Sequence, residues 1–247
     1  MRRSITSALA LAGLTLAALA LAAAPAVAAK RSAEAPNTHQ FVGSANVEPR
    51  FAGESAEFDL KPFEVECEKE KSTTSGVTPT FPSKTLTAVV KFSECEAEAE
   101  LDGAEYEFKA KFLSPVTFVY HANGIVEMGA GGTVNDGKLE GAGEIEIAVK
   151  GPFKCTIDIP AGTYPSTSAK HPEAEYEAAK FTNLEETIET GKGPVLEKKL
   201  GISTALSRVP YELEGEFCEA LPRTEFTKGT FEGSLVAEIK KGTLDRE

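Results

Sequence analysis

Tryptophan is absent from this 247-residue chain, and histidine, methionine and cysteine are scarce, at three, two and four residues. The lack of tryptophan argues against sugar binding, because sugar sites rely on aromatic platforms. Three histidines leave little scope for nucleophilic catalysis, which needs a histidine or a substitute within reach of serine or cysteine. The scarce residue types therefore disfavour the common hydrolytic centres.

Each histidine is predicted to be structural or exposed. His39 lies in an irregular N-terminal stretch and His171 in a polar loop. His121 ends a strand with parity opposite to the apolar Phe118 and Tyr120, so its side chain is expected to face solvent. No Gly-x-Ser-x-Gly or His-Glu-x-x-His motif accompanies them. We therefore predict no catalytic residues.

Metal and cofactor motifs are missing as well. Zinc would need closely spaced cysteines or interspersed histidines, and the cysteines are far apart. Asn135-Asp136-Gly137 offers oxygen ligands for calcium, but a hairpin turn is the better interpretation. The glycines at 129–132 lack the Lys-Ser/Thr of a phosphate-binding loop. No cofactor-binding or metal-ligating residue is predicted.

Long apolar runs are confined to the N-terminus, where residues 1–29 have the pattern of a secretory signal peptide. Two arginines precede an apolar segment over 8–24, and Ala26-Val27-Ala28 supplies the small-x-small site. We expect cleavage after Ala28 or Ala29 and a secreted or extracytoplasmic protein without a membrane span. An uncleaved anchor is the alternative, which the many alanines of the segment disfavour.

The charge of the chain is strongly negative, with 26 basic and 38 acidic residues and a net charge of −12. Removing Arg2 and Arg3 with the signal leaves 24 basic residues, hence a net charge of −14. An acidic surface repels phosphate backbones, so we expect no nucleic-acid partner. Any partner is expected to be an extracellular or envelope ligand, and the oligomeric state is left open.

The four cysteines form an even set in a chain expected to be exported, which favours disulfides. Three connectivities are possible. The pairing Cys67–Cys95 with Cys155–Cys218 is favoured because each bridge then closes a loop within one half of the chain.

The dominant hydrophobic period is two, which is typical of half-buried strands. The clearest example runs over 144–159, where apolar and charged residues alternate around an interruption at Gly151-Pro152. Hairpin signals lie between such runs, at Asp102-Gly103, Asn123-Gly124 and Asp136-Gly137. The sequence therefore predicts an all-β fold, an antiparallel sandwich or open barrel of about ten strands with two disulfides.

Helical patterns are scarce, and the division of the chain can be read in two ways. Residues 174–184 could form a helical turn or two, or a strand ending at Phe181. Residues 30–53 are expected to be a flexible lead, in which 40–47 could form one short strand, and residues 54–247 a β-rich body. That body is one domain or two halves with a boundary near 129–143.

Three segments resemble uncharacterised secreted β-rich proteins of high-GC Gram-positive bacteria. They are Phe153–Pro160, Tyr211–Cys218 and Gly229–Gly233, within a similarity that would cover Phe63 to Ile239. The resemblance implies an exported β-rich protein with no assigned activity. Those proteins carry a further cysteine pair, which this chain lacks near Ala104-Glu105-Tyr106.

Three functions remain open from the sequence. We expect a non-catalytic binding or structural protein outside the cytoplasm, because the β body lacks a recognisable reaction centre. A secreted hydrolase of glycans or esters using paired glutamates is the first alternative. The rows Glu96, Glu98, Glu100 and Glu212, Glu214, Glu216 would supply the pairs, although solvated strand faces explain both rows. A carrier of lipid or a small ligand is the second alternative.

Overall fold

The computed structural model describes residues 39–43, 50–68, 73–77, 81–101, 103–151, 154–164, 178–190, 193–216, 218, 229–238 and 244–247. Side chains are described for these ranges except at 50–55, 73–77, 101 and 188–190. The predicted signal peptide and His171 lie outside the described residues. Asn37–Glu247 forms one compact unit, and the fold below is that of this unit.

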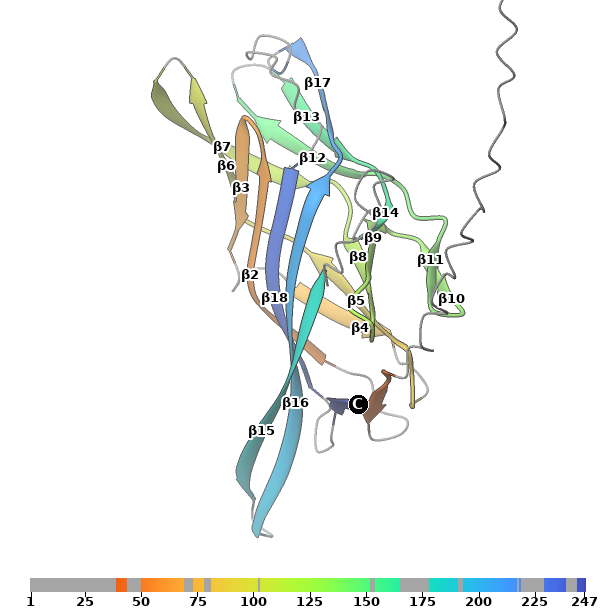
Figure 1. Ribbon diagram of the computed structural model, residues 1–247. Coiled ribbons are helices and arrows are strands. Elements are labelled where there is room, and N and C mark those ends of the chain that lie inside the picture. The colour runs from red at the N-terminus through yellow and green to blue at the C-terminus, as the bar shows by residue number, and fades with distance from the viewer. Residues whose placement is uncertain are drawn as a thin grey trace, which may run out of the picture. The chain divides into compact units, whose positions relative to one another are not determined.

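Two antiparallel sheets dominate the fold (Figure 1). The larger has ten strands in the order β15 (Ala179–Thr190), β16 (Gly193–Val209), β18 (Gly229–Glu238), β2 (Arg50–Leu60), β3 (Phe63–Cys67), β6 (Cys95–Leu101), β7 (Ala104–Phe112), β12 (Ile145–Lys150), β13 (Lys154–Ile159) and β17 (Glu212–Glu214). The smaller has the order β14 (Gly162–Tyr164), β9 (Val126–Ala130), β8 (Val116–His121), β5 (Thr85–Lys91) and β4 (Thr73–Val77). Two short, separate strand pairs complete the fold: β1 (Phe41–Gly43) with β19 (Leu244–Arg246), and β10 (Thr133–Asn135) with β11 (Lys138–Glu140).

The prediction of an all-β fold with open antiparallel sheets and two disulfides is confirmed. The strands are more numerous than the ten expected, since nineteen occur among the described residues and six of them have three residues. Such short strands leave no readable period in a sequence. The strands β12 and β13 lie where the alternation over 144–159 predicts them, with Ile147 and Ile157 paired and fully buried.

Aromatic side chains fill the space between the two sheets. Phe58 of β2 and Phe231 of β18 lie 4.5 Å apart between ring centroids, and Phe118 of β8 reaches Phe231 at 5.5 Å. Phe92, just after β5, packs against Phe112 of β7 at 4.6 Å. Burial of each such ring contributes roughly 1.5–3 kcal/mol. This aromatic cluster therefore joins the smaller sheet to the larger one.

The predicted hairpin signals lie at turns. Gly103 and Gly124 have φ values of 78° and 85°, in the left-handed region that glycine adopts readily. Asp136 and Gly137 have φ values of 49° and 75°, the pattern of a two-residue turn between paired strands. The glycine-rich stretch at 129–143 thus contains the β10–β11 hairpin.

Both disulfides have the connectivity that the sequence favours. Cys67 and Cys95 lie directly opposite each other on β3 and β6 and are bonded. Cys155 of β13 is bonded to Cys218, which follows β17. The bridges span 28 and 63 residues of sequence, so each closes a loop within one half of the chain.

The stretch 30–53 contains β1, which lies within the short strand suggested at 40–47, and also the start of β2. Phe41 of β1 is completely buried. The suggestion of a strand ending at Phe181 is wrong, because β15 continues to Thr190 along its partner β16. A helical turn near 174 lies partly outside the described residues, and from Ala179 onward the segment is strand.

Candidate functional site: a projecting ribbon and its clasp

A two-stranded ribbon projects from the β15 edge of the larger sheet (Figure 1). β15 and β16 pair without a break from Ala179–Thr204 to Thr190–Gly193. The described pairing of β16 with β18 ends at Lys199–Glu238, so beyond it no third strand supports the pair in the described part of the chain. We call residues 184–190 and 193–199 the ribbon.

The base of β16 follows the period-two rule and is anchored in the core. Leu200, Ile202 and Leu206 are almost completely buried and alternate with exposed or half-buried residues. Towards the tip this pattern gives way to charged residues and exposed hydrophobic ones. The alternation at 200–206 is the signal that could have predicted this strand from the sequence.

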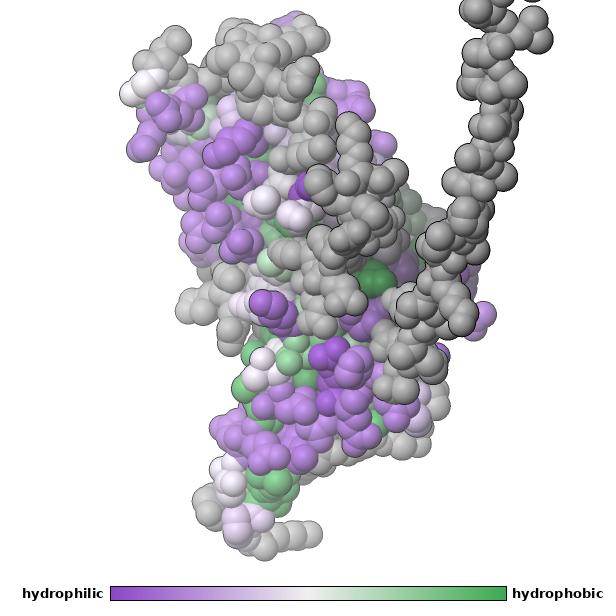
Figure 2. All heavy atoms as spheres, viewed as in Figure 1, coloured by the Kyte–Doolittle hydropathy of each residue, from purple (hydrophilic) through white to green (hydrophobic). Residues whose placement is uncertain are grey.

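Hydrophobic side chains are exposed on the ribbon. Five large hydrophobic side chains are exposed among the described residues, and three belong to the ribbon: Leu184 (39%), Val195 (40%) and Leu196 (49%). Val195 and Leu196 are consecutive in a strand, so their side chains point to opposite faces. Figure 2 shows hydrophobic surface near the end of the ribbon, next to charged surface. Clustered apolar exposure marks interaction sites more often than isolated residues do.

The strand pair β1–β19, which we call the clasp, holds the base of the ribbon. Gln40 and Glu247 exchange two backbone hydrogen bonds of 2.9 Å, which extend the pairing of the clasp by one residue. Phe41 of β1 packs edge to face against Phe181 of β15, with ring centroids 5.2 Å apart. The clasp thus brings residues from both ends of the described chain against the ribbon base.

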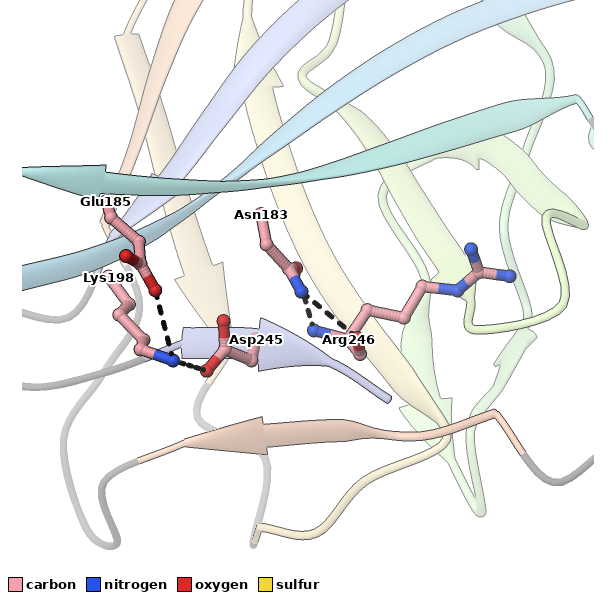
Figure 3. Close-up of polar contacts among 5 residues, drawn as sticks. All are labelled: Asn183, Glu185, Lys198, Asp245 and Arg246. Carbon is pink, nitrogen blue, oxygen red and sulfur yellow. Dashed lines mark hydrogen bonds and ion pairs between the residues drawn. The ribbon is translucent and has the colours of Figure 1, made fainter.

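Polar contacts between the clasp and the ribbon are drawn in Figure 3. The Nζ of Lys198 lies 3.4 Å from Glu185 on the ribbon and 3.1 Å from Asp245 on the clasp. The side-chain amide of Asn183 accepts a hydrogen bond from the Arg246 backbone N–H (3.1 Å) and donates one to its carbonyl (3.3 Å). Asn183 therefore acts like a residue of a paired strand and fixes the distance between β15 and β19.

The side chain of Arg246 makes two further contacts at this base. Its Nε donates a hydrogen bond to the carbonyl of Ala122 at 2.7 Å. Its guanidinium lies 5.0 Å from the ring centre of Phe181, a cation–π distance. Arg246 therefore links the clasp, the ribbon base and the turn after β8.

Ion pairs neutralise much of the charge on the ribbon. The pKa of Lys198 is raised, mainly by its hydrogen bond to Asp245. The pKa of Lys199 is also raised, mainly by its hydrogen bond to Glu186. The Lys199–Glu186 pair is short at 2.6 Å. Both lysines stay charged at neutral pH and compensate the charges of Glu185 and Glu186.

The structure places His121 differently from the expectation. Its side chain is 22% exposed, and its Nε2 lies 2.8 Å from Oε1 of Glu127. The parity relative to Phe118 and Tyr120 is as predicted, but the β10–β11 hairpin packs over this face of the smaller sheet. Leu139 of that hairpin donates its N–H to Oε2 of Glu127 at 2.6 Å. The expectation that His121 faces solvent is therefore wrong.

The surroundings of this pair indicate a structural role. Thr85 is the cross-strand partner of His121, which puts a hydroxyl, an imidazole and a carboxylate on one sheet face. The hydrogen bonds found at Thr85 are local, however: its N–H donates to Ser83 Oγ, and the Ser83 hydroxyl donates to its carbonyl. Glu127 uses both oxygens to hold His121 and the hairpin. The arrangement anchors the hairpin rather than activating a nucleophile.

Carboxylates lie opposite one another on the outer face of the larger sheet. A row of four exposed residues crosses β18, β2, β3 and β6: Glu232, Glu57, Glu66 and Glu96. Burial first, and then the neighbouring carboxylates, raise the pKa of Glu57. The charge of Glu107 is the main cause of a raised pKa of Glu96, and the two side chains are hydrogen-bonded. These glutamates lie on an open strand face, as the sequence predicts for Glu96, Glu98 and Glu100.

Other features bear on the remaining expectations. In the described ranges, no three His, Cys, Asp or Glu side chains come together in a way that could hold a metal ion. Nor does any helix there have the length and apolar character needed to cross a membrane. His39 is exposed. Sequence reasoning identified the cysteines, but it missed the ribbon, whose contacts with the clasp come from residues far apart in the sequence.

The fold and this site define a disulfide-bonded, all-β protein with a clasped, projecting β-ribbon. The chain matches no protein-family model, no curated protein sequence and no solved structure. The two disulfides are compatible with an extracytoplasmic location.

Proposed function

We propose that this is an extracytoplasmic binding or structural protein that acts by contact, with the ribbon as its contact element. The N-terminal signal pattern and the paired cysteines support the location. The observation that carries the contact role is the exposure of Leu184, Val195 and Leu196 on a projecting element whose base is fixed. A fixed base lowers the entropy cost of binding, because the ribbon is positioned before contact.

The ribbon suits a partner that offers a surface with both apolar and polar groups. Val195 and Leu196 provide apolar contact on the two faces of the tip. The paired charges Lys198–Glu185 and Lys199–Glu186 surround them with groups that remain hydrated at the rim of a contact. Each face of the tip thus carries an apolar side chain near hydrated charges, and interfaces commonly combine apolar contact with a polar rim.

The test measures retention of the purified protein on cell envelopes of the producing organism. The double variant Val195→Ser/Leu196→Ser should lower retention about tenfold or more, because two apolar contacts of roughly 1 kcal/mol each are lost. Leu113→Ser is the matched control, since Leu113 is 51% exposed and lies in the turn after β7. Unchanged retention of the tip variant, or an equal loss in the control, would count against the ribbon.

A further inference from the structure

The outer edge of β15 is long and regular. β15 has twelve residues without proline, and its register with β16 has no bulge. It is the terminal strand of the larger sheet, so in the described part of the chain no strand pairs with its other side. Proteins usually protect such edges by shortness, proline, bulges or unpaired charges, because a free edge accepts a further strand.

Two hydrogen bonds at the base show which backbone groups face this edge. The N–H of Ala179 points away from β16, where it donates to the carbonyl of Gly124 at 2.9 Å. The carbonyl of the preceding Ala178 points towards β16 and accepts from Ala205. Since these directions alternate along a strand, Phe181, Asn183, Glu185 and Thr187 also present their N–H and C=O groups outwards.

Two of the charges on β15 are paired with lysines of the neighbouring strand. Glu185 and Glu186 each have a lysine partner on β16, at 3.4 and 2.6 Å. Lys180 is the one lysine of β15, and it lies near the base. Leu184, in the middle, is 39% exposed. A ribbon of only two strands is also marginal by itself, and stability usually requires three or more.

We propose that a second copy of this chain pairs its β15 antiparallel along this edge, with Leu184 near the two-fold axis; this rests on the proposed contact role of the ribbon. The other terminal strands of the two sheets have three to five residues, so β15 is the best match in length for itself. The dimer contains a continuous four-stranded ribbon in the order β16, β15, β15, β16.

The register follows from side-chain chemistry. With Leu184 opposite its own copy, Asn183 faces Glu185 and Phe181 faces Thr187, and all four present outward backbone groups. Glu186 of each copy then lies diagonally next to Lys180 of the other. These two favourable contacts outnumber the one diagonal contact between the two copies of Glu185. Centring on Glu185 or Glu186 would instead place like charges opposite each other. The contact is isologous and closes as a dimer.

The experiment is sedimentation velocity of the purified chain over a range of micromolar concentrations. Thr187→Pro removes an outward N–H and leaves the pairing with β16 intact, whereas Thr187→Ala keeps that N–H. We expect the wild type and Thr187→Ala to form dimers, and Thr187→Pro to weaken dimerisation about tenfold or more. Circular dichroism checks that each variant is folded.

A second variant keeps the test decisive. Leu184→Lys places two like charges at the axis and should also give monomers, and it decides the matter if Thr187→Pro does not fold. A monomeric wild type at every concentration, or dimers that persist in folded Thr187→Pro and in Leu184→Lys, would overturn the inference. The proposed function is judged separately, because Val195→Ser/Leu196→Ser alters envelope retention and leaves the β15 edge intact.

Discussion

At the residue scale, Glu127 is the side chain whose role is clearest from its contacts. It is 13% exposed, and its two oxygens contact His121 Nε2 and the Leu139 N–H. A buried carboxylate is tolerated when its hydrogen-bonding capacity is used in this way. The half-buried His121 and the β10–β11 hairpin therefore depend on this single group.

Replacing Glu127 by glutamine should lower the free energy of unfolding by about 1–3 kcal/mol, because the charge-assisted bond to the backbone is weakened. The amide of Leu139 should lose hydrogen-exchange protection first. The measurement is urea denaturation together with native-state hydrogen exchange. Glu140→Gln is the control, since Glu140 is exposed and contacts Asn135, and a similar loss there would contradict the assignment.

Residue types with fixed chemistry were predictable from the sequence. The four cysteines pair as their positions along the chain favour, and the turn residues Asp136 and Gly137 adopt left-handed backbone angles. The orientation of His121 was not predictable, because parity gives the face of a strand but not what covers that face. Its cover is a hairpin whose strands of three residues carry no periodic signal.

At the scale of single elements, the larger sheet carries like charges opposite one another. Glu57 faces Glu66 on one side and Glu232 on the other. Like charges in directly opposite positions destabilise a sheet. Burial first, and then this repulsion, raises the pKa of Glu57, whereas the charge of Glu107 is the main cause of the raised pKa of Glu96. Both shifts set the direction of the pH dependence.

The melting temperature should rise on mild acidification from pH 7 to about pH 5. Carboxyls with a raised pKa bind protons more tightly in the folded than in the unfolded state, so their contribution favours folding at low pH and is lost as pH rises. The pKa of Asp158 is also raised, mainly by burial of its carboxyl group. The measurement is thermal denaturation at the two pH values.

Glu57→Gln provides the control for this prediction. It should raise the melting temperature at pH 7 and reduce the gain on acidification, because one member of the carboxylate row no longer ionises. Glu185→Gln, at a glutamate that faces a lysine, should not have this effect. A melting temperature that falls steadily from pH 7 to pH 5 in the wild type would contradict the account.

Long elements differ in how far the sequence predicts them. β12 and β13 follow from strict alternation, with Ile145, Ile147 and Val149 buried on one face. β15 and β16 were not predicted as a pair, because their ends away from the core lose the alternation. There the pairing depends on cross-strand charges and on the clasp, which sequence periodicity does not report.

At the scale of the whole molecule, the clasp and the disulfides act on different regions. The clasp joins β1 and β19 to the base of the ribbon, through Phe41, Asp245 and Arg246. The disulfides lie at β3–β6 and after β17. The bonded cysteines therefore lie away from the ribbon, whose tip retains exposed hydrophobic side chains.

Hydrogen–deuterium exchange of the intact chain, with and without cell envelopes of the producing organism, tests the contact role of the ribbon most directly. We predict that added envelopes protect the backbone amides of the ribbon, residues 184–190 and 193–199, while those of β6 and β7 beneath the carboxylates exchange unchanged. Protection that appears on β6 and β7 and leaves the ribbon unaffected would contradict the account.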